Sequence, residues 1–260
     1  MHLFIKYGYL EAFFKGVFCT GVFLASFSFA CALTISPARV ELNGNPGQTV
    51  TGEYVLINDQ EKTKTFYSSF ENFEAQGETG SPNFVGGTEG LATWINSSSE
   101  IVLGPKETKK LMYSITIPAN ADPGGHFAAI FWGTSKPQTS AGGGDVSVGA
   151  KLGLVMLLRV SGDVPEGGGV LSFETLDEQK LEEEETSEQK LFIMLPVDFN
   201  YRFQNSGGDR IKPKGTITIK NIFGMTSEVL NANPSEGNVL PSSIRKFKLS
   251  WNGGDGKKVE

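Results

Sequence analysis

Apolar and polar residues alternate along much of the chain after residue 33, and this period of two is typical of β-strands. Residues 48–58 and 109–118 each place apolar side chains on one face of an extended chain and polar side chains on the other. The apolar faces consist of Val50, Tyr54 and Leu56 in the first range, and of Leu111, Tyr113, Ile115 and Ile117 in the second. Such strands have one face in a core and one in water, as in an antiparallel sandwich.

The longest alternating run covers residues 146–164, and its second face is partly apolar through Val155 and Leu157. We therefore expect a central strand there. Shorter runs follow at 170–175, 197–203, 215–220 and 244–251, whereas helical periodicity is nearly absent. The pattern predicts an all-β fold made of two tandem Ig-like antiparallel β-sandwiches after an N-terminal signal helix.

Breaks in the alternation suggest how the chain is divided. We expect a first Ig-like domain at 33–163 and a linker at 164–190, which contains a short strand and an acidic run. The acidic run, 177–190, is interpreted as a solvated loop or short helix, and residues 137–145 as a flexible loop inside the first domain. The second Ig-like domain, 191–260, offers only about four or five strands where a free-standing one has about seven, so we expect it to be incomplete.

The first 32 residues resemble a secretory signal peptide. Lys6 and Lys15 precede an apolar stretch at 17–29, and the small residues at 30–32 fit a cleavage site. Two alternatives stay open, a retained membrane anchor and a lipidated Cys31, although the leucine usual three residues before a lipidated cysteine is missing. Export to the cell envelope or surface is the prediction.

Cleavage after residue 32 removes both cysteines and leaves His126 as the single histidine. A disulfide framework, a cysteine-ligated zinc site, a thiol nucleophile and a multi-histidine metal site are then excluded within one chain. No phosphate-binding or calcium-binding loop motif occurs. We therefore predict no catalytic, cofactor or metal residues, although the many acidic pairs leave an envelope hydrolase open as a weaker alternative.

Charge differs between the two parts of the chain. The formal net charge of −6 argues against nucleic acid as a partner. Residues 33–163 carry 9 basic and 13 acidic side chains, whereas residues 191–260 carry 10 and 6. The basic residues of the second part could form a surface for a protein partner, or they could be ordinary solvated strand residues. The candidates for partner contact are Arg210, Lys212, Lys214 and Lys220.

Aromatic residues near one turn are the candidates for sugar contact. The segment Asp122-Pro123-Gly124-Gly125 predicts a turn before a strand. Glycan binding on a β-surface needs an aromatic platform with fixed polar groups, whereas the alternative for each residue is a place in the core or at the start of a strand. The candidates are Trp94, His126, Phe127 and Trp132.

Several short motifs resemble the WxL-interacting proteins in their order along the chain. They lie at 36–42, 45–50, 55–58, 101–107, 115–118 and, most specifically, 121–130. Further matches at 203–207, 213–217, 223–224 and 239–241 are similar to that family's partner-binding domain. The resemblance implies a first domain that binds peptidoglycan, a second that binds a protein, and membrane attachment through a C-terminal segment that is not among these 260 residues.

Three functional hypotheses follow. The first is an exported, non-catalytic envelope protein that contacts peptidoglycan or another wall polymer through one domain and another cell-surface protein through the other. The second is a chaperone-like or stalk module that binds protein by strand addition and has no affinity for glycan. The third is the envelope hydrolase. None of them requires a cofactor.

Overall fold

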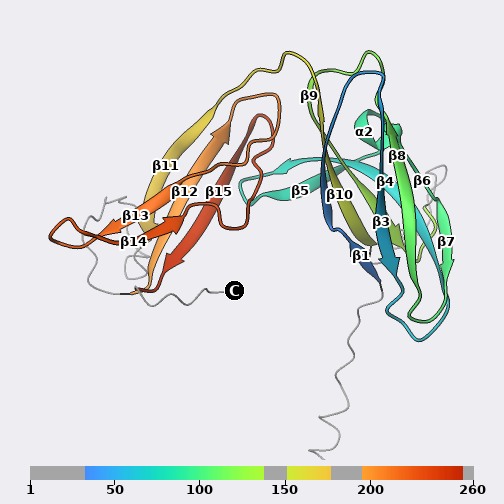
Figure 1. Ribbon diagram of the computed structural model, residues 1–260, viewed down its shortest axis with the longest axis horizontal. Coiled ribbons are helices and arrows are strands. Elements are labelled where there is room, and N and C mark those ends of the chain that lie inside the picture. Colours follow the sequence, from blue (N-terminus) through green and yellow to red (C-terminus); the bar gives the residue numbers. More distant parts are fainter. Residues whose placement is uncertain (1–32, 138–150, 177–194, 254–260) are drawn as a thin grey trace, which may run out of the picture.

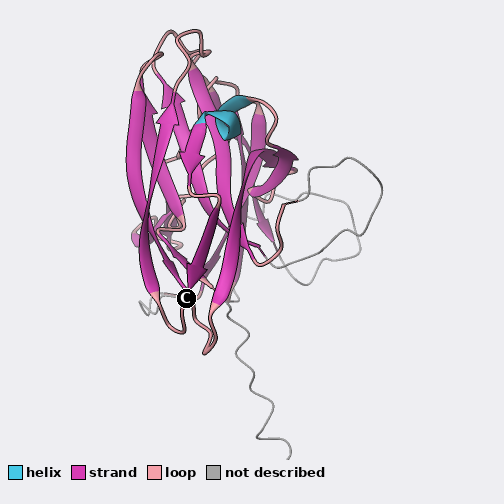
Figure 2. Cartoon of the chain, turned by 90° about the vertical axis from the view of Figure 1, so that its right-hand side faces the viewer, coloured by secondary structure: helices cyan, strands magenta, loops and turns pink. Residues whose placement is uncertain are grey.

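The computed structural model describes residues 33–137, 151–176 and 195–253. The predicted signal segment, the acidic run and nearly all of the predicted loop at 137–145 lie outside the described residues. The fold is all-β, with two Ig-like units side by side (Figure 1). A single short helix, α2 (Gly90–Trp94), occurs in the described ranges (Figure 2). The predicted fold class is confirmed.

The first layer of the first unit is a four-stranded antiparallel sheet with the order β1-β3-β8-β6. Its strands are β1 (Thr34–Ser36), β3 (Thr49–Ile57), β8 (Thr108–Thr116) and β6 (Ile95–Ser97). The alternation that predicted β3 and β8 corresponds to their burial. Leu111, Tyr113 and Ile115 of β8 are buried, whereas Met112, which points to the other face, is 61% exposed.

The second layer of the first unit has the order β2-β10-β9-β4-β5, with β7 paired to β4. Its strands are β2 (Arg39–Gly44), β10 (Lys151–Val160), β9 (Gly124–Gly133), β4 (Lys64–Gln76), β5 (Ser81–Gly86) and β7 (Glu100–Leu103). The pairing of β2 with β10 is parallel, and the other pairings of this layer are antiparallel. Since β1 belongs to the first layer and β2 to the second, the chain changes layers between Ser36 and Arg39.

Large apolar side chains from both layers fill the core between them. Trp132 of β9, Leu154 and Met156 of β10, and Leu56 of β3 have no exposed surface. The indole nitrogen of Trp132 donates a hydrogen bond to the Tyr54 hydroxyl at 3.0 Å, so the polar atom of this ring is satisfied inside the core.

The second unit combines a three-stranded antiparallel sheet with a hairpin. The sheet has the order β11-β12-β15, with β11 (Gly168–Leu176), β12 (Val197–Asn205) and β15 (Ser243–Trp251), and the hairpin joins β13 (Thr216–Lys220) to β14 (Thr226–Asn231). The short strand expected inside the linker is β11, and it pairs with β12. Tyr201, Val239 and Phe247 form the buried core of this unit, and the rings of Tyr201 and Phe247 stack at 4.8 Å.

Candidate functional site

The glycine-rich turn before β9 forms a contact between the two units. The amide nitrogen of Gly125 donates to the carbonyl oxygen of Gly208 at 2.9 Å. Gly124 has a φ of +119°, and a Cβ there would lie 2.5 Å from that same oxygen. Arg159 at the end of β10 adds an ion pair with Asp209 at 3.0 Å. The turn therefore fits against the backbone of the second unit, which explains both glycines.

A cleft of about 200 Å³ lies between the units and has mainly apolar walls. Phe73, Val155 and Leu157 line it from the first unit, and Leu240 and Ile244 line it from the second. Arg39 and Arg245 also line this cleft. An apolar cleft with two cationic groups suits a ligand that combines apolar groups with an anion.

The two cleft arginines come from different units. Arg39 begins β2, whereas Arg245 lies on β15. Burial lowers the pKa of Arg245, Tyr201 acts in the opposite direction, and repulsion by the positive charge of Arg39 lowers the pKa further. Nη1 of Arg245 donates to the carbonyl oxygen of Asn238 at 2.8 Å, while its Nε is buried without a hydrogen-bond partner in the described residues. A carboxylate between the arginines would relieve this repulsion.

The edge of β10 that faces away from β9 is only partly paired. β2 covers it from Val155 to Val160, beginning with a hydrogen bond from the Val155 amide to the Ala38 carbonyl at 2.9 Å. Backbone groups of alternate residues point to the same side of a strand, so those of Gly153 and Lys151 point the same way as those of Val155. Within the described ranges, no strand pairs with this edge between Lys151 and Leu154. The unpaired part of this edge ends at Leu154, and the next residue, Val155, lines the cleft.

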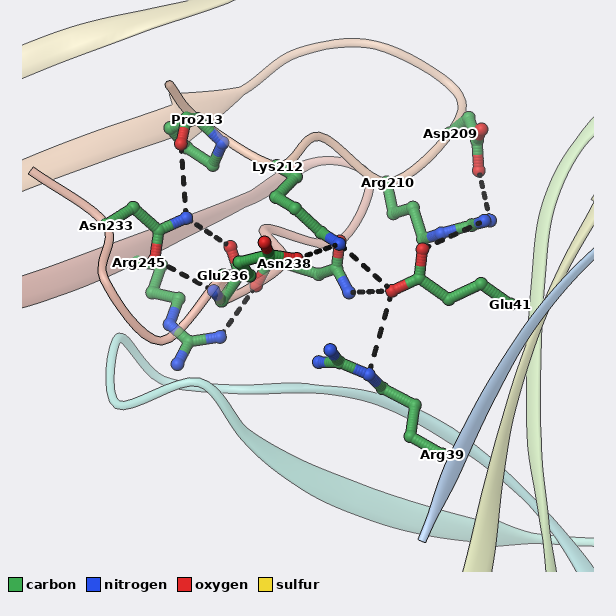
Figure 3. A network of polar contacts seen from close by, with 11 residues as sticks. Arg39, Glu41, Asp209, Arg210, Lys212, Pro213, Asn233, Glu236, Asn238 and Arg245 are labelled. Atoms are coloured by element: carbon green, nitrogen blue, oxygen red, sulfur yellow. Dashed lines mark hydrogen bonds and ion pairs between the residues drawn. The ribbon is translucent and has the colours of Figure 1, made fainter. Parts of the chain in front are cut away.

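Glu41 on β2 holds the second unit through several side chains (Figure 3). Its carboxylate lies 3.4 Å from Nζ of Lys212, 3.8 Å from Nη2 of Arg210 and 3.6 Å from Nε of Arg39. Asn238 donates to the same carboxylate at 3.3 Å. Because three of these partners belong to the second unit, Glu41 joins the two units beside the cleft.

Glu41 should make stability depend on pH. Burial by itself raises the pKa of Glu41, but the hydrogen bond from Asn238 and the charges of Lys212 and Arg210 outweigh it, so the pKa lies below the ordinary value of 4.5. Ionised Glu41 therefore adds stability above pH 4.5 that is lost as the pH falls through the lowered pKa. Urea unfolding from pH 7 to pH 3 should show that Glu41→Gln is less stable than the unchanged protein at pH 7 and that the two converge in acid. A gap that stays constant with pH would contradict this role.

The predicted partner-contact residues do not gather on one outward surface. Arg210 is only 12% exposed and pairs with Asp209 and Glu41, and Lys212 pairs with Glu41 and Glu236. Two of the four candidates thus contact the first unit of the same chain. Lys214 and Lys220 are exposed, and a role in partner contact stays a prediction for them.

The predicted sugar-contact residues also separate. Trp132 is fully buried, so the proposal that its ring is a sugar platform is wrong. Trp94 and His126 lie together, with ring centroids 4.7 Å apart, and Nε2 of His126 donates to the Asp122 carbonyl at 2.8 Å. Phe127 contacts Phe73 instead, at 5.8 Å. These residues do not form one shared platform.

Sequence reasoning counted Arg245 only among the basic residues of the second part that could form one surface, and it missed Arg39 and the free edge. Arg39 belongs to the motif at 36–42, and Arg245 belongs to the strand predicted at 244–251. Nothing in either pattern places the two side chains together. The alternating run at 146–164 predicted a central strand, and β10 does lie between β9 and β2, but the described residues leave its edge unpaired from Lys151 to Leu154. In the ranges that the structure describes, no group of three or more His, Cys, Asp or Glu side chains is placed to hold a metal ion. No helix there has the length and apolar character that a membrane span requires.

No protein-family model and no curated protein sequence matches the chain. Among solved structures, the class 5 fimbrial chaperone CfaA is 11% identical, with 87% of this chain and 95% of that chain covered and a TM-score of 0.45. The Escherichia coli chaperone DraB is 14% identical, with 84% of each chain covered and a TM-score of 0.39. A chain of the Salmonella enterica SafA pilin–SafB chaperone complex is 11% identical, covers 86% and 84%, and has a TM-score of 0.40.

The similar structures are mainly fimbrial chaperones and not WxL-interacting proteins, so the family resemblance inferred from the sequence is wrong. Its motifs combine short alternating strand segments with turn residues, and both recur in unrelated β-sandwiches because the same backbone geometry demands them. The most specific of them, around Gly124 and Gly125, is explained by the contact with Gly208. Peptidoglycan contact rested on that resemblance and loses its support.

Proposed function

We propose that this protein is an exported, non-catalytic interaction module that binds an extended segment of another protein. The segment adds as a strand to the free edge of β10, and its terminal carboxylate lies between Arg39 and Arg245. The observation that carries the proposal is the position of this edge, because β2 leaves residues 151–154 uncovered and the uncovered part leads into the two-arginine cleft. Strand addition of this kind supplies affinity through main-chain hydrogen bonds.

The geometry also favours one direction for the added strand. β2 occupies the edge from Val155 onward, opposite Arg39, so an added strand must end there. A segment that runs parallel to β10 arrives with its C-terminus at the arginines, whereas an antiparallel one arrives with its positively charged N-terminus. Two cations favour the carboxylate, and therefore the parallel orientation.

We infer export from the signal-like sequence of residues 1–32. We infer that the cleft binds a ligand and does not catalyse a reaction from the residues that line it. Its walls are apolar, and its charged groups are arginines, which stay protonated and do not act as general acids or bases at neutral pH. The arrangement suits recognition of an anion within an apolar surface.

Lys151→Pro tests the free edge. Proline removes an amide that points away from β9, so it should spare the sheet while weakening strand addition by about tenfold. The probe is the tightest binder from a library of ten-residue peptides that alternate apolar and polar residues and end in a free carboxylate, measured by fluorescence anisotropy.

Lys151→Ala is the matched control, because it removes the same side chain, including its exposed contact with Glu71, and keeps the amide. It should bind the probe peptide as the unchanged protein does. The proposal is overturned if no library peptide binds, or if proline and alanine weaken binding equally.

A further inference from the structure

The hairpin formed by β4 and β5 reaches from the first unit to the second (Figure 1). We name residues 72–86 the bridging hairpin. At its turn, the Glu78 carbonyl accepts a hydrogen bond from the Lys246 amide at 2.7 Å. The Glu78 carboxylate accepts from both Nε and Nη2 of Arg202, the former at 2.8 Å. Because Arg202 and Lys246 are paired residues of β12 and β15, one glutamate binds both strands.

The same hairpin confines the cleft arginine of the second unit. A Cβ at Gly80 would lie 2.4 Å from Cζ of Arg245, and a Cβ at Gly237 would lie 2.8 Å from the same atom. Arg245 therefore lies close to backbone from both units, and only glycine leaves room for its guanidinium group at Gly80, where φ is +79°. Arg245 also directly precedes Lys246, the residue that the hairpin binds. The position of Arg245 thus depends on where the hairpin lies.

Arg39 and Arg245 belong to different units, so their separation depends on how the units are held. The contacts of Gly125 and Arg159 join the units beside the chain connection, and the bridging hairpin joins them at the turn between β4 and β5. Two attachments at separate places resist rotation of one unit relative to the other, whereas a single attachment would allow it.

We propose that the bridging hairpin holds Arg245 opposite Arg39, with Glu78 as the positioning residue that sets the selectivity of the cleft for a carboxylate. This inference rests on the proposed function, because it concerns how the same cleft recognises the end of an added strand. Glu78 and Arg202 are 36% and 38% exposed, and exposed ion pairs contribute little to folding stability. The bidentate pair is therefore expected to act on the geometry of the cleft more than on stability.

The test compares two forms of the probe peptide, one with a free C-terminal carboxylate and one with an amide. The unchanged protein should bind the carboxylate form about tenfold more tightly. Glu78→Ala should remove most of this preference without weakening the amide form, since the amide form does not use the charge of the arginines. The reversed pair, Glu78→Arg with Arg202→Glu, should restore the preference.

Glu236→Ala is the matched control. Glu236 also forms an ion pair, with Lys212, but both residues belong to the second unit, so this pair does not join the two units. It should leave the preference unchanged. Retention of the full preference in Glu78→Ala, while Arg245→Gln abolishes it, would overturn this inference and leave the proposed function standing. Equal binding of both peptide forms to the unchanged protein would overturn the inference and the carboxylate site together. Failure of every peptide to bind would instead overturn strand addition itself.

Discussion

Replacing Trp132 with alanine should lower the free energy of unfolding by about 3–5 kcal/mol, the range found for large aromatic residues removed from a core. The Trp132 side chain has no exposed surface and lies between the two layers of the first unit. The substitution opens a cavity and also removes the hydrogen bond to Tyr54. Urea unfolding followed by circular dichroism would measure the loss.

Trp94→Ala provides the matched control, because Trp94 is only partly buried and packs beside His126. Its loss should lower the free energy of unfolding by only about 1 kcal/mol, as for an average substitution. Equal losses for the two tryptophans would contradict the assignment of Trp132 to the centre of the core.

Changing both cleft arginines to glutamine should weaken binding of the free-carboxylate probe peptide by about tenfold, because the charge-assisted hydrogen bonds of these arginines supply the tenfold preference for the carboxylate. Binding of the amidated peptide should change little. The two arginines are 206 residues apart in sequence (245 − 39), so the double variant Arg39→Gln with Arg245→Gln tests a site that exists only in the fold. Titration calorimetry with both peptides gives the comparison.

A double variant of exposed lysines separates a specific site from general positive charge. Lys214→Gln with Lys220→Gln removes the same net charge from residues that lie outside the cleft lining. It should leave the affinity for the free-carboxylate peptide unchanged. A loss as large as that of the arginine variant would show that the cleft itself is not the binding site, and it would favour the surface of lysines predicted from the sequence.

The fold class was predictable because burial on one face imposes a period of two on the sequence. β3, β8, β12 and β15 each follow such a run of alternating residues. The change of layer between β1 and β2 was not predictable. β1 has only three residues, and the change arises because β1 pairs with β3 while β2 pairs with β10. The helix α2 was also missed, since five residues are too few to show a helical period.

The candidate site depends on distances that the sequence does not contain. Trp132 shows the limit most clearly, because a tryptophan in a strand can lie in a core or on a binding surface. Its phase with Ala128 and Ile130, both fully buried, was the signal that favoured the core. Arg39 and Arg245 carried no comparable signal, because each alternates normally within its own strand and only the association of the two units brings them together.

The parallel pairing of β2 with β10 has a mechanical consequence. The six residues of β2, Arg39–Gly44, run in the same direction as Val155–Val160, and the chain leads from the end of β10 into the second unit. Tension applied upstream of β2 and downstream of β10 therefore pulls along the strands, in shear, and loads every hydrogen bond of this ladder at once. A ladder loaded from one end would open bond by bond. This pairing gives the first unit a clamp against stretching.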